Sequence, residues 1–341
     1  MMYSDSDLEA AVVAGVLSPD TATALRNHVA ARRNSPAVDE ENFRLLTGFN
    51  DIFVAIAGVL LLAGAAQIGG QVHMAFGGGF VAAAAWGLAE YFTRVRRMAL
   101  PSIIFLLAFV GGVFTTLAGI LVPGGNVSDG DTLGAVLRAA SAAGAGIAAW
   151  LHWRRFQVPI TIAAGVAAGV GAVALLFVAS VPAIETVIYA VMLILGIAVF
   201  AFAMYWDASD KTRTTRRSDV AFWLHLLAAP LLVHPVFQML GLLDGNPSIP
   251  EAVVVILLYI AMGLVALAID RRALLVSALG YVIYAMIALF SEFGAISLNV
   301  ALAGFVIGSA LLMLSAFWQT VRARVVGLLP DQLVKGLPAT T

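Results

Sequence analysis

The sequence predicts an all-α integral membrane protein with about ten transmembrane helices, both termini in the cytoplasm and a short helical hairpin at the N-terminus. Three observations predict this class. First, 61% of the 341 residues are hydrophobic and only 11% are charged, whereas soluble domains have roughly a quarter charged residues. Second, continuous apolar stretches of about 20 residues, long enough to cross a bilayer, recur from Asn50 onwards. Third, lysine and arginine gather in every second connection between these stretches.

The first 48 residues predict a cytoplasmic helical pair followed by a polar linker. In the stretch DSDLEAAVVAGVLSPDTATALRNHVAARR, Gly15 suits the left-handed end of a first helix, and Ser18 with Pro19 suits the start of a second. A pair this small buries too little surface to be stable alone. We therefore expect residues 5–33 to dock on the membrane domain, on another copy of the chain or on a protein partner. No basic segment precedes an apolar one here, so we expect no cleavable signal peptide.

Residues 49–320 predict the transmembrane bundle, and residues 321–341 predict a cytoplasmic tail. Each span is an apolar window long enough to cross a hydrocarbon core roughly 30 Å thick. The expected spans cover residues 50–70, 73–92, 100–122, 132–152, 157–180, 183–205, 219–243, 250–269, 273–290 and 297–320. The lipid bilayer is therefore the expected surrounding of this part of the chain.

The basic residues predict the orientation of the spans. Apart from Arg138, every lysine and arginine lies before the first span or after an even-numbered one. The connections on the opposite side contain acidic residues and no basic ones: Asp129, Asp131, Asp244, Glu251 and Glu292. By the positive-inside rule, both termini are expected in the cytoplasm.

Spans that run toward the cytoplasm end in a similar pattern, as in YFTRVRRMALP, WLHWRRFQVP and LAIDRRALLV. Just before the first of these segments, Glu90 is expected to pair with Arg94 one helical turn later. One interpretation of the pattern is that any array of helical hairpins with short loops repeats at this length. A second is that spans six to ten form an inverted copy of spans one to five, as in inverted-repeat transporters.

The segment GVLSPDTATAL, the many spans and the tail GLLPDQLVKGLPAT resemble a group of bacterial predicted membrane proteins of unknown function. The resemblance extends loosely over the whole chain. It implies a multi-pass protein of the bacterial inner membrane with no assigned activity, and it therefore assigns no catalytic residue.

Span seven contains the stretch FWLHLLAAPLLVHPVFQML, where histidines and prolines interrupt an apolar run. Pro230 and Pro235 cannot donate hydrogen bonds to the carbonyls four residues earlier, so we expect a helix kink. His234 and Gln238 share a helical face, and His225 faces the other way. Either these side chains only hydrogen-bond neighbouring helices, or they line a polar pathway and contact a proton or small solute.

Arg138 is the only basic residue within a predicted span. Its long side chain could reach the outer membrane surface beside Asp131. Alternatively, it faces the bundle and pairs with an acid at the same level, for which Glu185 is the first choice and Glu292 the second. A buried pair of this kind could gate the protein or bind an anion, so Arg138 and Glu185 join the candidate pathway residues.

Glycine-rich motifs predict helix packing rather than chemistry. The motifs GVAAG at Gly165, GFVIG at Gly304, GGGF at Gly77 and GG at Gly111 let helices approach closely. The sequence contains no cysteine, no P-loop, no GxSxG or HExxH motif, and its five histidines are scattered. We therefore expect no enzyme, no metal, no cofactor and no nucleic-acid partner.

Two functions fit these observations. The first is a carrier or channel for a small solute or proton, with a polar cavity around a kinked span seven. The second is a non-transporting membrane scaffold, sensor or assembly factor that acts through the cytoplasmic helical pair. A water-accessible cavity shared by His234, Gln238 and Arg138 would favour the first function, and local hydrogen bonds that seal each side chain would favour the second.

Overall fold

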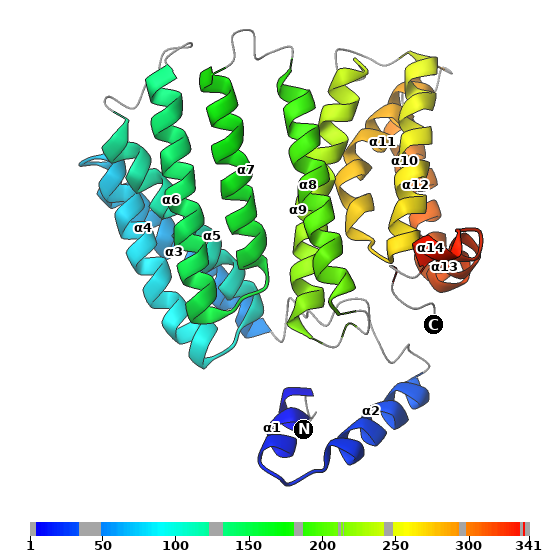
Figure 1. Ribbon diagram of the computed structural model, residues 1–341, viewed down its shortest axis with the longest axis horizontal. Coiled ribbons are helices and arrows are strands. Elements are labelled where there is room, and N and C mark those ends of the chain that lie inside the picture. The colour runs from blue at the N-terminus through cyan, green and yellow to red at the C-terminus, as the bar shows by residue number, and fades with distance from the viewer. Residues whose placement is uncertain are drawn as a thin grey trace. The chain divides into compact units, whose positions relative to one another are not determined.

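The computed structural model describes residues 5–33, 49–122, 132–180, 187–210, 213, 215–241, 248–292, 298–334 and 337, and within these ranges it is helical without a strand (Figure 1). The predicted all-α class is therefore confirmed for the described residues. The chain divides into two compact units, Met1–Asn42 and Phe43–Thr341.

The first unit contains the two predicted helices, α1 (Asp5–Val13) and α2 (Pro19–Arg33). Gly15 follows α1 with φ +72°, a left-handed conformation that glycine adopts without strain. Ser18 precedes α2, and its Oγ accepts a hydrogen bond from the backbone N–H of Thr21 at 3.1 Å. The predicted end of the first helix and the predicted start of the second are both confirmed.

The second unit contains the apolar helices. Their bounds are α3 (Phe49–Gly70), α4 (Met74–Leu88), the π-helix η1 (Ala89–Val95), α5 (Ala99–Leu121), α6 (Thr132–Phe156), α7 (Ile160–Ser180), α8 (Ile188–Ala208), α9 (Arg216–Met239), α10 (Ile249–Ile269), α11 (Ala273–Glu292), α12 (Asn299–Ala316), α13 (Trp318–Gly327) and α14 (Asp331–Val334). Each predicted span overlaps one of the helices from α3 to α12.

Within the described ranges, eight helices are long and apolar enough to cross a membrane: α3, α5, α6, α7, α8, α9, α10 and α12. Helix α4 has only 15 residues before the backbone changes to the wider π-helix η1. Helix α11 includes positions whose side chains lie outside the described set. The structure therefore supports a membrane protein built from apolar helices, and by this criterion it contains eight candidate spans rather than ten.

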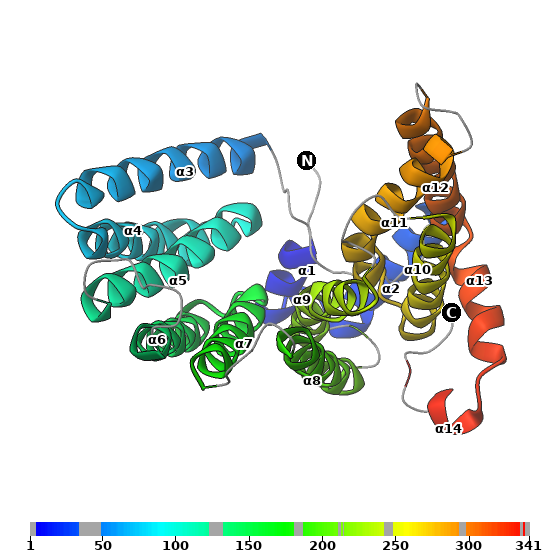
Figure 2. The ribbon, with the colours of Figure 1, turned by 90° about the horizontal axis from the view of Figure 1, so that it is seen from above.

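The helices of the second unit pack in two groups, α3–α7 and α8–α13 (Figure 2). In the first group each helix packs against the next along the chain, and α3 also packs against α5. In the second group α9 packs against α8 and α11, while α13 packs against α10. The two groups meet where α7 contacts α8 and α9. Helix α9 therefore lies at the centre of the packing between the groups.

Helix α9 is the most enclosed of the eight candidate spans. Half of its most apolar stretch is buried, against at most 39% in the others. The helix continues through Pro230 and Pro235, and the kink expected there stays a prediction. Pro235 leaves the carbonyl of Leu231 without an intrahelical donor. Gly196 of α8 lies against this carbonyl, because a Cβ added at Gly196 would be 2.7 Å from its oxygen.

Close contacts at glycine confirm part of the predicted packing. A Cβ added at Gly78 of α4 would lie 2.6 Å from the carbonyl oxygen of Gly112 on α5, and one added at Gly112 would lie 2.7 Å from that of Gly78. Gly77 is similarly close to α3. Gly304, by contrast, has no neighbour within 4 Å of such a Cβ among the described residues. The small residues therefore bring α3, α4 and α5 together, whereas packing at Gly304 stays a prediction.

Candidate functional site

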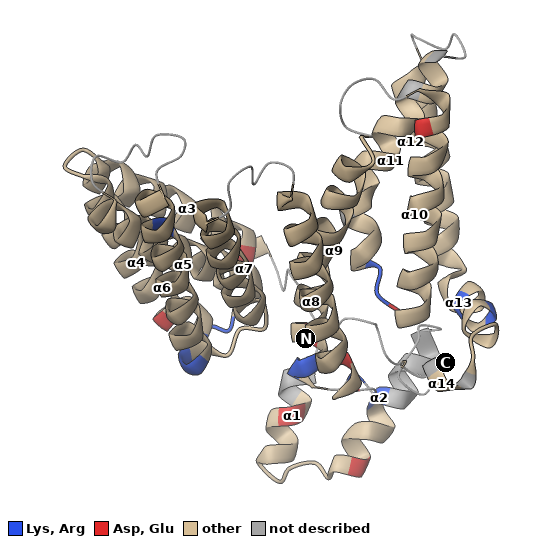
Figure 3. Cartoon of the chain, turned by 45° about the horizontal axis from the view of Figure 1, so that its top comes forward, with Lys and Arg blue, Asp and Glu red and all other residues tan. Residues whose placement is uncertain are grey.

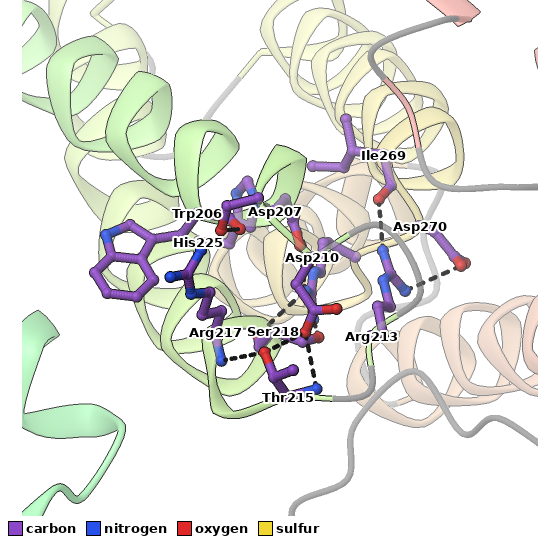
Figure 4. A network of polar contacts seen from close by, with 12 residues as sticks. Trp206, Asp207, Asp210, Arg213, Thr215, Arg217, Ser218, His225, Ile269 and Asp270 are labelled. Atoms are coloured by element: carbon purple, nitrogen blue, oxygen red, sulfur yellow. Dashed lines mark hydrogen bonds and ion pairs between the residues drawn. The ribbon is translucent and has the colours of Figure 1, made fainter.

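A network of buried charges lies at one end of the second helix group and connects its helices there (Figure 4). It joins the end of α8, the α8–α9 connection, the start of α9, the turn between α10 and α11, and α13. Every ionisable residue in it is at most 7% exposed. Among the described residues these are Asp207, Asp210, Arg213, His225, Asp270, Arg271 and Arg322.

Asp207, in the last turn of α8, is the centre of the first half of the network. Its Oδ2 lies 2.9 Å from Nε2 of His225 on α9 and accepts a hydrogen bond from Nε of Arg271 at 3.2 Å. The Nη2 group of Arg271 donates to Oδ1 of the same carboxylate. It also donates to the backbone carbonyl and Oγ of Ser218 at 3.2 and 3.1 Å. One arginine in the α10–α11 turn thus ties α8 to α9.

Asp270 is the centre of the second half. Its backbone is left-handed, with φ +59°, where it ends α10. Oδ2 accepts a hydrogen bond from Nη1 of Arg213 at 3.0 Å, and Oδ1 accepts one from Nε1 of Trp318 at 2.7 Å. Nε of Arg322 lies 3.6 Å from Oδ1. A single carboxylate therefore holds the α8–α9 connection and helix α13 against the end of α10.

The α8–α9 connection is closed by a third carboxylate. Oδ2 of Asp210 accepts hydrogen bonds from the backbone N–H of Thr215 at 2.9 Å and from its hydroxyl at 2.7 Å. Thr215 in turn caps α9, because its Oγ1 accepts a hydrogen bond from the backbone N–H of Arg217 at 3.3 Å. Asp210 therefore fixes the residue at which α9 begins.

The charges of the network cancel when His225 is neutral. Three aspartates face three arginines, and buried charges of opposite sign are tolerated because they compensate one another. Nδ1 of His225 and Nη1 of Arg271 are among the buried polar atoms that have no hydrogen-bond partner within the described residues. Among the described residues of this network, a proton added to His225 would therefore lack a compensating carboxylate.

A second cluster of charges lies at the ends of η1 and α6 (Figure 3). Glu90 accepts a hydrogen bond from Nη1 of Arg94 at 3.3 Å, which confirms the predicted pair. Arg155 of α6 makes a better contact, because its Nε and Nη2 donate to the two oxygens of Glu90 at 2.7 and 3.0 Å. These side chains are partly exposed, in contrast to the buried network.

The structure gives the two histidines of span seven separate partners. His225 is fully buried beside Asp207, whereas His234 lies nine residues further along α9 and is exposed. Nδ1 of His234 is 2.7 Å from the hydroxyl of Tyr281 on α11. Gln238, one turn beyond His234, is half-buried. The two histidines are therefore not brought together in one site.

Arg138 belongs to the first helix group. It lies in α6, is half-buried, and has no hydrogen bond or ion pair within the described part of the chain. Its predicted partners Asp131 and Glu185, and the side chain of Glu292, lie outside the described residues. The described contacts do not bring Arg138 together with His234, whose partners are on α8 and α11.

Reasoning from the sequence missed most of the buried network. It used Arg213, Arg271 and Arg322 only as indicators of orientation, and it did not consider Asp207 and Asp270. The available signal was an acidic residue at the end of an apolar helix, as in MYWDASD and LAIDRR. An aspartate there must find a partner if the next helix covers it.

Comparison of the chain with protein-family models, curated proteins and solved structures found no match. Among the described residues, no group of three or more histidine, aspartate and glutamate side chains could hold a metal ion.

Proposed function

We propose that the chain is a multi-pass protein of the bacterial inner membrane that carries protons, alone or together with a small solute. We further propose that it has ten spans with both termini in the cytoplasm. Helix α4 and η1 run without a break from Met74 to Val95, and α11 has 20 residues. Both lengths reach the roughly 20 residues that cross a bilayer.

The distribution of arginine supports this orientation. The described arginines of the second unit, Arg138 excepted, lie at the ends of η1, α6, α8 and α10, at the start of α9, and in α13. With ten spans, all of these ends are on one side of the membrane. A strong bias of this kind marks the cytoplasmic side.

The observation that carries the proposal is the contact between His225, on the most enclosed helix α9, and Asp207 on α8. Ionisable groups inside membrane helices are rare, and they commonly mark the pathways of ions and protons. His225 is faced by Asp207 from α8 and Arg271 from the α10–α11 turn, with Arg213 in the same network. Helix α7 contributes no charged residue to this region. Histidine is the side chain whose charge changes most readily near neutral pH.

A proton on His225 would therefore alter the network. Among the described residues, the network contains no fourth buried carboxylate to compensate the added positive charge, which also competes with Arg271 for Asp207. The α10–α11 turn is held to α8 and α9 through this arginine. We infer that proton binding loosens the turn and so couples protonation to movement between α8–α9 and α10–α11.

Proton uptake into proteoliposomes tests this proposal. A potassium gradient with valinomycin drives uptake, and a pH-sensitive dye inside the vesicles reports it. We expect vesicles with the wild-type protein to take up protons faster than empty ones. His225→Gln should reduce this difference in uptake rate about tenfold or more, since an amide does not carry the proton. His234→Gln and Arg138→Ala test the other candidates. Wild-type uptake no faster than that of empty vesicles would contradict the carrier.

The second candidate function is a non-transporting scaffold, sensor or assembly factor. The observation that favours it is the N-terminal pair of helices, which belongs to a compact unit distinct from the membrane unit. If this unit joins copies of the chain, deleting residues 5–33 should reduce the mass of the detergent-solubilised particle to that of a smaller assembly. An unchanged mass together with proton flux would leave the carrier as the better supported function.

A further inference from the structure

The two helix groups use their arginines differently. In the second group Arg213, Arg271 and Arg322 are buried and bound to aspartates. In the first group the arginines at the ends of η1 and α6 are exposed. Figure 3 marks the positions of lysine and arginine along the chain in blue. These exposed residues, called the arginine patch below, are Arg94, Arg96, Arg97, Arg154 and Arg155.

Glu90 brings the two halves of the arginine patch together. Arg94 comes from the same helix as Glu90, and Arg155 comes from α6, 65 positions further along the chain. Because both bind one carboxylate, the guanidinium groups of two different helix ends lie side by side. Glu90 supplies one negative charge against the five positive charges of the patch, so the patch keeps a large excess of positive charge.

The backbone around the arginine patch is specialised. Residues Ala89–Val95 form a π-helix, a conformation that is rare and often occurs at functional sites. Arg97 follows with φ +53°, where glycine would be the usual residue. An arginine at such a position costs conformational energy and gains no hydrogen bond or ion pair from the described residues. The exposed positive charge is therefore the property that Arg97 provides and that glycine would not.

Exposed apolar side chains lie beside the charges. Tyr91 and Trp150 are each 53% exposed, and Val95 is 65% exposed. The guanidinium of Arg154 lies 5.1 Å from the centre of the Trp150 ring, which orients it at the helix end. Aromatic rings next to arginines at the end of apolar helices are typical of the membrane–water interface.

From this combination we infer that the arginine patch binds the phosphate groups of anionic phospholipids. Guanidinium groups form bidentate hydrogen bonds with phosphate oxygens, and the exposed rings can lie against the acyl chains of the same lipid. Basic clusters at the ends of transmembrane helices attract anionic headgroups. A soluble acidic partner would use the charges but not the exposed apolar side chains. The inference stands independently of proton transport.

Retention of lipid by the purified full-length chain tests the inference. The protein is exchanged into mixed micelles with phosphatidylglycerol or phosphatidylcholine, and bound lipid is counted by native mass spectrometry. Wild type should retain phosphatidylglycerol preferentially. The triple variant Arg96→Gln, Arg97→Gln, Arg154→Gln should bind it roughly 100-fold more weakly, at about fivefold for each arginine removed.

The matched control is Arg216→Gln with Arg217→Gln, an exposed arginine pair at the start of α9. This control should retain phosphatidylglycerol like the wild type. Equal retention of both lipids by wild type would overturn the inference, as would equal losses in the triple variant and the control. Displacement of the lipid by inorganic phosphate at equal concentration would also overturn it. If the triple variant does not fold, retention of phosphatidylglycerol by the wild type is measured at increasing salt concentration. Ionic binding to the headgroup must weaken as salt rises, so unchanged retention would overturn the inference.

Discussion

Asp270 combines a strained backbone with unusually many partners. Left-handed φ angles disfavour residues other than glycine, although aspartate and asparagine tolerate them better than most. Four non-glycine residues in the described chain have positive φ, and each lies in one of the connections that follow η1, α6, α8 and α10: Arg97, Gln157, Arg213 and Asp270. In the second helix group, the side chains at these turns form the buried network. Glycine has no side chain and could not make the hydrogen bonds that Arg213 and Asp270 make, which explains why it does not occupy these two left-handed positions.

Asp270→Asn should destabilise the protein strongly. Asparagine also tolerates the left-handed backbone, so the substitution mainly removes the charge that faces Arg213 and Arg322. Breaking a buried ion pair leaves an uncompensated charge and costs about 3 kcal/mol or more. Denaturation in mixed micelles of a mild detergent and SDS, followed by tryptophan fluorescence, measures the change, since Trp318 donates to Asp270.

Glu90→Gln is the control for this measurement. Glu90 also binds two arginines, but its side chain is 32% exposed. Exposed ion pairs are worth at most about 1 kcal/mol, so this variant should unfold close to the wild type. If Asp270→Asn loses no more stability than Glu90→Gln, the buried network does not hold the ends of α8, α10 and α13 together.

The backbones of helices α8 and α9 approach closely at Gly196 and Leu231. Pro235 removes the donor for the carbonyl of Leu231, and Gly196 lets α8 cover that oxygen. Gly196→Ala should therefore destabilise the protein by about 1–3 kcal/mol, because the added Cβ meets backbone atoms that cannot rotate away. The same denaturation experiment measures this loss.

Gly169→Ala on α7 is the matched control. A Cβ at Gly169 meets nothing within 4 Å among the described residues. Alanine lowers the entropic cost of forming a helix, so this variant should be neutral or more stable by up to about 1 kcal/mol. Similar losses at both glycines would mean that α8 and α9 are not in close contact at Leu231.

The apolar helices could be predicted from the sequence because hydropathy acts locally. The span expected at 100–122 is observed as α5, Ala99–Leu121. The span expected at 183–205 is α8, Ile188–Ala208, which continues past the predicted end to include Asp207. A hydropathy window stops at a charged residue, whereas the helix continues because His225 and Arg271 compensate that charge. Prediction from local composition fails where a residue from elsewhere in the chain compensates a charge and so determines where the helix ends.

The candidate site could not be predicted for the same reason. Arg213 and Asp270 are 57 positions apart, and Asp207 and Arg271 are 64 apart. No local pattern connects residues at such distances. The sequence did single out His225, but its partner Asp207 is on another helix, and the fold alone brings them within 2.9 Å.

At the scale of the whole molecule, α3–α7 and α8–α12 divide the membrane unit into five helices and five. This division agrees with the idea of two related halves, but the contacts differ, since α3 packs against α5 while α9 packs against α11. The arginines differ too, since Arg213, Arg271 and Arg322 of the second helix group are buried, whereas the residues of the arginine patch are exposed. The positive-inside rule counts both sets alike, although only the exposed set is available to lipid headgroups or other partners.

The number of spans can be tested by cysteine labelling, because the natural chain contains no cysteine. Single cysteines at the exposed positions Gln71, Thr132, Ile249 and Leu298 flank the helices in question. If both α4 and α11 cross the membrane, all four lie on the outer side, and a membrane-impermeant maleimide should label all four in intact cells. Cysteine at Thr320, on α13, should react only after the membrane is permeabilised.

Each alternative gives a different labelling pattern. If α4 does not cross, Gln71 and Thr132 lie on opposite sides, because α5 alone separates them. If α11 does not cross, Ile249 and Leu298 lie on opposite sides, because α10 alone separates them. Eight spans would therefore split both pairs, whereas ten spans keep each pair together. Since the ends of η1 and α10 carry the arginine patch and the buried network, the same four cysteines also decide whether these two features face one compartment.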